Sequence, residues 1–593
     1  MIRFAAPLLA FLVAAMPVPA AAADPAKVLR VAFPDVTLLD PQQLTDLYSA
    51  RVVAAVFEGL YEYEYLSDPA RIVPNTAEAL PEITEGGRVW TIRIKRGIRF
   101  ADHPAFKGRA RELVASDYVY SLKRWLDPTL KAGGEARLTD LVVGARAVVD
   151  AARSSGRFDY DAPIAGLRAV DSHTLRFELA EVDYTLLEVL ARVQAFAVAR
   201  EVIEASGGDP SAHAVGTGPY RVAEWKRGSK LVLVASPGYR DVAFPAVRDP
   251  ALQPLAAAMA GAKLPAVGRI ELDIIEEEVP EILAFERGDL DFALLTGRGA
   301  QRLLPGGKLR GDLAKRGVRH VRYTVPALIY TYFNMDDPVV GGSVQDRIAL
   351  RRAIGMGFNV PEMIRVLYGG DAIPASQFMP PGVESHDPAI PPKSNYDAAA
   401  ARALLDRFGY RDRDGDGYRE RPDGSPLVLS RASTTDSFAR ESDLLWLSSM
   451  KAIGLRMEVQ SAPFAELLKR SLAGQLQMFN LGYRADSASG YSSMTTLWGK
   501  APPDTNRARF RNADYDAAYE AFLRTPPGPQ RLSLARRMSE IVQAHAPIVF
   551  HVYPQGHAFV QPWLKGYRPS AFGTFWKYVD IDADAKARAG KAR

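Results

Sequence analysis

Cysteine is absent from this chain of 593 residues. Its absence excludes disulfide bonds, thiol nucleophiles, zinc–thiolate sites and a lipid-modified cysteine. Long hydrophobic runs are scarce too. The apolar stretch from Phe4 to Met16 is too short to span a bilayer comfortably, and no later run approaches the roughly 18 residues that a membrane helix needs. Because a chain of this length buries a large core without disulfide bonds, we expect a soluble globular protein.

Catalytic motifs are also missing. The chain contains no H-E-x-x-H, no G-x-S-x-G and no G-x-x-x-x-G-K-[ST]. Among eight histidines, His545, His551 and His557 lie close together, but their spacing of six places them on no single helical face. "PIVFHVYPQGHAFV" predicts a pair of strands joined by a turn, with histidines in the core or on the surface; metal or haem ligation is the alternative. We therefore expect no enzyme, and a metal-dependent hydrolase is the less favoured alternative.

Charge of one sign is not in large excess. The formal net charge is +5, and basic residues are scattered among acidic ones. This balance gives little support to a nucleic-acid partner. The exception is "KARAGKAR" at residues 586–593, which we expect to be a solvated basic tail.

The beginning of the chain is typical of a cleavable secretory signal peptide. Arg3 precedes the apolar run, and small residues at Ala21 and Ala23 follow it. We expect residues 1–23 to be removed, so that the mature chain begins near Asp24. With no cysteine for a lipid anchor, we expect the protein to be free in a bacterial periplasm.

Hydrophobic periodicity predicts a mixed α/β protein. Apolar residues alternate with polar ones from Trp90 to Ile94, as in a half-buried strand. Residues 395–410, "NYDAAAARALLDRFGY", have apolar residues at helical spacing. Asn395 or Asp397 can cap the start of this helix and Gly409 its end.

An acidic stretch matches most of a calcium-loop template. In "DRDGDGYRERPD", Asp412, Asp414 and Asp416 occupy loop positions 1, 3 and 5, Gly417 position 6 and Asp423 position 12. A helix is predicted before the loop and a strand, "PLVLS", after it, so the paired helices of an EF-hand are not expected. Two interpretations stay open: a solvated turn without metal, or a turn that holds a structural calcium ion. In both, the loop is scaffold.

Several motifs follow one another along nearly the whole mature chain. They are "LLDPQQ", the E-G-L, P-x-x-A-E and K-x-G-x-x-F motifs within "VFEGLYEYEYLSDPARIVPNTAEALPEITEGGRVWTIRIKRGIRF", "VASDYVYSLKRWLDP", "GTGPYRVAEWKRGSKLVLVASPGYR", "FERGDLDFALL" and "YFNMDDP" with "DRIALRRAIGMGFNVPEMIRVLYGG". The ordered set resembles the extracellular solute-binding protein family 5, which comprises the oligopeptide- and dipeptide-binding components of ABC importers.

The resemblance implies two hinge-linked lobes, with an extra subdomain in lobe one. Lobe one would comprise residues 24–322, with the inserted subdomain at about 64–195, and lobe two residues 323–552. Residues 553–593 would return to lobe one and end in the basic tail. The chain would cross between the lobes near Tyr323 and near Tyr553.

The resemblance also implies a function: a solute binds in the cleft, and the lobes close over it. A separate ATPase would supply the energy through a membrane permease. No cofactor is required, and the structural calcium ion considered above is optional. We expect a monomer.

One segment, "MFNLGYRADSASGYSSM", bears on the solute. In peptide-binding relatives the matching segment is roughly G-W-x-x-D, and its aspartate pairs with the α-ammonium of the peptide. By resemblance this aspartate is Asp486, and Tyr483 stands in place of the tryptophan. Asn480 lies where some relatives have a basic residue for the peptide carboxylate, and Arg484 is a candidate substitute. The alternative for Asp486 is a loop carboxylate that caps local backbone amides.

A peptide is therefore the favoured solute. Because this fold binds many kinds of molecule, nickel chelates, haem, opines and oligosaccharides stay as alternatives.

Overall fold

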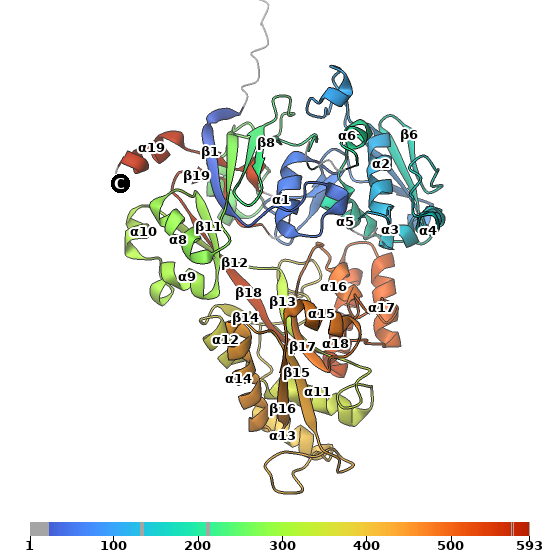
Figure 1. Cartoon of the computed structure of the whole chain (residues 1–593), viewed down its shortest axis with the longest axis vertical. Coiled ribbons are helices and arrows are strands. Elements are labelled where there is room, and N and C mark those ends of the chain that lie inside the picture. Colours follow the sequence, from blue (N-terminus) through green and yellow to red (C-terminus); the bar gives the residue numbers. More distant parts are fainter. Residues whose placement is uncertain are drawn as a thin grey trace, which may run out of the picture.

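The computed structural model describes residues 23–130, 136–208, 211, 214–570, 572 and 575–591. Residues 1–22 of the expected signal peptide lie outside the described residues. Figure 1 shows two lobes, one above the other: a broad upper lobe one and a wedge-shaped lobe two below it. In the part of the chain that the structure describes, no helix is both long and apolar enough to cross a membrane.

Lobe one is built on a four-stranded sheet in the order β1-β10-β9-β8. The strands are β1 (Asp24–Phe33), β8 (Tyr220–Lys226), β9 (Lys230–Ala235) and β10 (Val267–Ile274). β1 and β10 are parallel, and the other pairs are antiparallel. Alternate residues such as Leu231 and Leu233 are fully buried in a core that also receives α1 (Leu47–Val56).

The subdomain inserted in lobe one has an antiparallel sheet in the order β4-β5-β7-β6. Its strands are β4 (Glu82–Thr84), β5 (Val89–Arg93), β6 (Leu167–Asp171) and β7 (Thr174–Glu178). Its helices are α2 (Ala115–Leu126), α3 (Ala136–Leu141), α4 (Ala145–Ser155) and α5 (Leu186–Leu190). Trp90, Ile92 and Ile94 are all buried, which confirms the predicted alternation. The sheet spans residues 82–178.

Lobe two shares a mixed eight-stranded sheet with lobe one, with β11-β18-β13-β17-β15-β16 along its path and β12 and β14 also paired with β18. The strands of this shared sheet are β11 (Phe292–Thr296), β12 (Arg319–Thr324), β13 (Ala327–Phe333), β14 (Ala372–Pro374), β15 (Val428–Ser433), β16 (Arg456–Ser461), β17 (Met478–Arg484) and β18 (Ile548–Val560). Helices of lobe two include α11 (Gln345–Gly357), α12 (Val360–Leu367), α13 (Ala398–Arg407), α14 (Ser437–Ala452), α15 (Phe464–Leu472), α16 (Tyr491–Thr495), α17 (Ala513–Arg524) and α18 (Pro529–His545). The predicted helix is α13, and Asp397 caps it by accepting a hydrogen bond from the Ala400 backbone N–H at 2.8 Å.

The long strand β18 joins the two lobes. Its first half pairs with β13 in lobe two, and its second half, from Gln555 to Val560, pairs with β11 and β12 in lobe one. The chain makes its other crossing between Thr324, at the end of β12, and Ala327, at the start of β13. The predicted pair of strands with a turn at this segment is wrong. Pro554 lies at the change of partners, where its carbonyl accepts a hydrogen bond from Val325 and the strand continues.

The C-terminal segment differs from the expected solvated tail. Residues 583–591 form helix α19 (Ala583–Lys591), which lies at the edge of lobe one (Figure 1). Lys586 of this helix donates hydrogen bonds to the Val28 carbonyl and to the fully buried Asp291 carboxylate. A buried carboxylate is costly without a cation beside it, so the ion pair between Asp291 and Lys586 holds helix α19 against lobe one.

Candidate functional site

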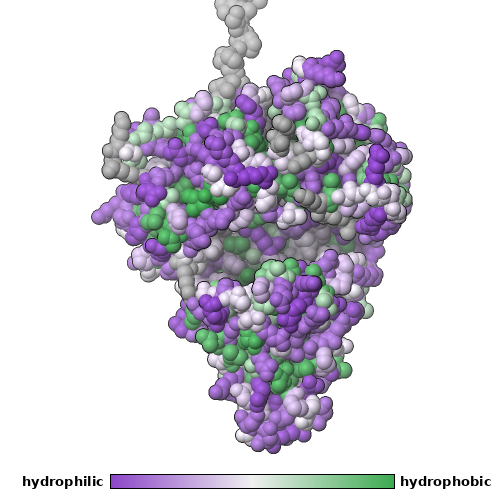
Figure 2. Space-filling model, in the orientation of Figure 1, coloured by the Kyte–Doolittle hydropathy of each residue, from purple (hydrophilic) through white to green (hydrophobic). Residues whose placement is uncertain are grey.

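A cavity of about 460 Å³ lies between the lobes. Lobe one contributes α1 and the segment after α5, the return segment contributes residues near Lys577, and lobe two contributes Arg484, Ala485 and Asp486. On the face drawn in Figure 2, a hollow separates the surfaces of the two lobes. Only an enclosure with walls from both lobes can engage a solute on two sides, so this cavity is the candidate site.

Helix α1 forms the wall on the lobe-one side. Asp46 caps its start by accepting a hydrogen bond from the Ser49 N–H at 2.7 Å. Val52 and Val53 are fully buried in the core, while Arg51 lines the cavity. The end of the helix is held close to the "GTG" motif: a Cβ added at Gly216 would lie 2.1 Å from the Val56 carbonyl oxygen. Glycine is required there because the two backbones touch.

The end of β17 forms the opposite wall. β17 pairs with β13 up to the Arg484–Ala327 position, and the Ala485 N–H then donates to the Pro326 carbonyl at 2.8 Å. This places Arg484 and Asp486 on the cavity, as candidate ligand residues. Tyr483 does not line the cavity; its hydroxyl donates to the Phe378 carbonyl.

Asp486 forms an ion pair across the cleft with Arg192 of lobe one. Its other carboxylate oxygen accepts a hydrogen bond from the Ser492 hydroxyl. The Asp486 side chain is 46% exposed, so solvent and a solute can reach it. The carboxylate therefore faces the opposite lobe, with a cation already beside it.

Two further ion pairs include residues of the cavity wall and were not predicted from the sequence. Lys577 lies 2.6 Å from Glu62, and Glu58 lies 2.6 Å from Arg240. Burial by itself raises the pKa of Glu58, but Arg240 outweighs it and holds that pKa below its usual value. Glu58 belongs to the E-G-L motif, so the motif itself was the available signal.

The lobes are in direct contact beside the cavity. The Tyr184 N–H donates to the Leu523 carbonyl at 2.9 Å, and the Ser489 N–H donates to the Glu188 carboxylate at the same distance. One hydrophobic cluster contains both Leu186 of the subdomain and Phe522 of lobe two. The structure is therefore a closed arrangement of the lobes.

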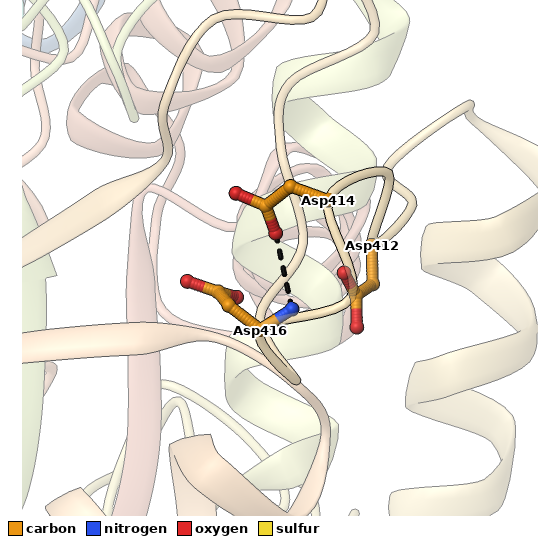
Figure 3. A group of neighbouring side chains, drawn as sticks. All are labelled: Asp412, Asp414 and Asp416. Carbon is orange, nitrogen blue, oxygen red and sulfur yellow. Dashed lines mark hydrogen bonds between the residues drawn. The ribbon is translucent and has the colours of Figure 1, made fainter.

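The acidic loop lies far from this cavity, between α13 and β15. The carboxylates of Asp412, Asp414 and Asp416 come within 4.8 Å of one another on the surface (Figure 3). Asp412 accepts backbone hydrogen bonds at 2.7 and 2.9 Å, and Asp416 pairs with Arg456. The Asp423 carboxylate bonds to Ser425 instead. Three oxygen donors suit a hard cation, and the arginine competes with it for Asp416.

Comparisons with known proteins agree with the two-lobed fold. The chain is 25% identical over 514 residues to di/tripeptide-binding protein 2 of Pseudomonas aeruginosa, covering 84% of this chain and 85% of the relative. It is 22% identical to heme-binding protein A of Haemophilus influenzae, covering 88% and 86%. The solved structure of the periplasmic binding protein DppA from Helicobacter pylori, in complex with the peptide STSA, matches with a TM-score of 0.67 at 19% identity, covering 94% and 99%. A family model matches residues 71–504, and the chain belongs to the bacterial extracellular solute-binding proteins, family 5.

Proposed function

We propose that this protein is the periplasmic binding component of an ABC importer and that it binds a short peptide in the cavity between its lobes. The observation that carries the proposal is the pair of opposed walls, with Asp486 of lobe two facing lobe one. A cavity of about 460 Å³ falls in the range of about 300–1,000 Å³ typical of small-ligand sites. One of the compared proteins is named as a di/tripeptide-binding protein, and one of the compared structures is described as a complex with a peptide.

Asp486 takes the α-ammonium of the peptide in this proposal. A carboxylate offers about four lone-pair sites, so an ammonium group can join Arg192 and Ser492 or displace Arg192. Arg484 serves the carboxylate side of the peptide. Tyr483 acts as a support, because its hydrogen bond to Phe378 fixes the strand end that carries both residues.

Closure of the lobes completes the cycle. The closed, loaded monomer docks on the permease, whose ATPase subunits supply the energy. Export to the periplasm depends on the expected signal peptide. The protein performs no chemistry on the solute, so peptides incubated with it, with and without chelator, are expected to return intact by mass spectrometry.

Calorimetry with Asp486→Asn tests the proposal. The probes are a mixture of free di- and tripeptides and the same mixture N-acetylated. A hydrogen bond to a charged group contributes about 1.5–3 kcal/mol, so we expect the variant to bind the free peptides about 10- to 100-fold more weakly. Wild type should discriminate against the acetylated mixture, and the variant should not.

Asp336→Asn is the matched control. Asp336 lies in lobe two, is 48% exposed and pairs with Arg511 at 3.0 Å, but it does not line the cavity. It should leave affinity unchanged. Equal binding of free peptides by wild type and Asp486→Asn would favour a structural role of Asp486, through its contacts with Arg192 and Ser492, and remove the residue-level support for a peptide.

Native mass spectrometry of protein purified from its host identifies the solute directly. A retained peptide supports the proposal. A retained haem would replace the peptide as the assigned solute, and one relative is named as a haem-binding protein. A retained nickel chelate, opine or oligosaccharide would also replace the peptide.

A further inference from the structure

On the cavity wall, the acidic side chains have partners on the protein, but not every basic side chain forms an ion pair with a described residue. Each acidic residue there has a partner on the protein: Glu62 pairs with Lys577, Glu58 with Arg240 and Asp486 with Arg192. The remaining carboxylate, Asp46, accepts hydrogen bonds from the Ser49 N–H and the Thr37 hydroxyl. Every carboxylate of the wall therefore already has a partner on the protein.

Arg51 has no such partner. Among the described residues no carboxylate forms an ion pair with it; its guanidinium lies 5.7 Å from the centre of the Tyr48 ring. An aromatic face attracts a cation weakly and does not neutralise it. Arg51 therefore brings to the cavity a positive charge that no carboxylate in the described part of the chain compensates.

Arg484 brings a second positive charge to the same cavity from the opposite lobe. Desolvation by the cleft, with the like charge of Arg51, lowers the pKa of Arg484. Tyr323 is partly buried, and the positive charges of Arg484 and Arg51 oppose the rise in its pKa that burial causes. Closing the lobes thus brings two cations to one cavity, and an anion between them would be attracted by both.

We propose that the space between Arg51 and Arg484 binds an oxyanion of the solute, which bridges the two lobes and thereby couples recognition to closure. Two guanidinium groups provide planar forks of N–H donors that match carboxylate or phosphate oxygens. The arginines lie on opposite lobes, so the anion has both partners only in the closed form and shifts the equilibrium toward it. The proposal rests on the proposed function for the rest of the solute. Its charge requirement is testable without any peptide.

The first experiment uses simple anions. Melting temperature and small-angle scattering are measured for the solute-free protein in sodium acetate, phosphate or chloride at equal ionic strength. Wild type should melt higher and be more compact in acetate or phosphate than in chloride. The larger of the two shifts tells whether a carboxylate or a phosphate group is the better match. Arg51→Gln and Arg484→Gln should each lose the difference.

Arg227→Gln is the matched control. Arg227 also lies over an aromatic ring, that of Trp225 at 4.2 Å, but outside the cavity. It should keep the wild-type response to anions. Arg51→Lys retains the charge and should keep part of the response, which separates charge from packing. Equal responses in all variants, or no difference between oxyanions and chloride in wild type, would overturn the proposal.

The second experiment links the anion to the solute. Free-acid di- and tripeptides are compared with their C-terminal amides by calorimetry. Wild type should prefer the free acids at least tenfold, and Arg51→Gln should lose this preference while keeping the preference for a free amine. If no peptide binds, the proposed peptide function fails, and the response to simple anions still decides whether the arginine pair is an oxyanion site.

Discussion

Glu188 in the subdomain of lobe one and Arg531 in lobe two form an ion pair that is buried between the lobes. The Arg531 Nη2 lies 3.4 Å from the Glu188 Oε1, and the two side chains are 6% (Glu188) and 2% (Arg531) exposed. The Ser489 N–H donates to the other oxygen of Glu188 at 2.9 Å. Burial raises the pKa of Glu188, although Arg531 opposes the rise. Opening the cleft would separate these groups and let water reach both.

Glu188→Gln is expected to shift the protein toward the open form. The change leaves the Arg531 cation buried without a counter-charge, and removing one partner of a buried pair costs about 3–5 kcal/mol. Opening hydrates Arg531 and relieves this cost. Small-angle scattering of the solute-free variant should give a larger radius of gyration than wild type. Glu520→Gln, which affects an outer ion pair of α17, should not.

A double-mutant cycle checks that the effect comes from this pair. Arg531→Met alone should also open the protein, while Glu188→Gln combined with Arg531→Met should be closer to wild type than either single variant. Single variants as compact as wild type would mean that the pair does not hold the lobes together.

A second prediction concerns acid stability and His551. This histidine is fully buried on β18, with its Nε2 2.9 Å from the Thr331 hydroxyl. Burial, with a smaller contribution from Arg431, lowers its pKa to about 3. In the unfolded chain the pKa is about 6.5, so below that pH the unfolded state binds a proton that the folded state does not. The contribution of neutral His551 to the free energy of unfolding is therefore fully present above pH 6.5. It is lost as the pH falls below that value, by about 1.4 kcal/mol per pH unit.

Urea denaturation at several pH values between 7.5 and 5 tests this slope. The free energy of unfolding of His551→Gln should fall less steeply below pH 6.5 than that of wild type, whatever its value at pH 7.5. Parallel curves for the two proteins would show that His551 is not kept neutral by the fold.

Local features of this fold were predictable from the sequence, and contacts between distant segments were not. The α13 helix and its Asp397 cap depend on residues a few positions apart, so periodicity and capping rules found them. The ion pair between Arg192 and Asp486 joins residues 294 positions apart. No local pattern marks Arg192 or Arg51 as a cavity residue; only the closed fold brings them to the cleft.

The strand β18 shows the same limit in another way. Pro554 and Gly556 are typical turn residues, and a turn was predicted there. The chain instead continues as one strand, because each half has partners in a different lobe. The motif order could indicate that the chain crosses here, but the form of the crossing depends on strands far away in the sequence.

A third prediction concerns export. The small-residue site ends at Ala23, and β1 begins at Asp24. Protein isolated from the periplasm should therefore begin at or within a few residues of Asp24, as measured by intact mass. Periplasmic protein that retains Met1 would contradict it.

The last prediction concerns calcium at the acidic loop. Extracellular calcium sites commonly have dissociation constants of about 10⁻⁴ to 10⁻³ M, and binding to the folded state alone adds RT ln(1 + [L]/Kd) to its stability. We expect millimolar calcium to raise the melting temperature modestly and Asp414→Asn to remove the rise. Asp289→Asn, in an exposed turn of lobe one, is the control and should keep it.

Solute affinity should stay the same with calcium or with chelator. The loop lies between α13 and β15, at the end of lobe two remote from the cavity, so the ion can stiffen this turn without touching the solute. Arg456 already neutralises Asp416, so the gain in stability is small even when calcium binds. If chelator abolished solute binding, the loop would be coupled to the cleft and its interpretation as scaffold would be wrong. If calcium changed neither melting temperature nor affinity, the loop would be a solvated turn whose carboxylates serve only its own backbone and Arg456.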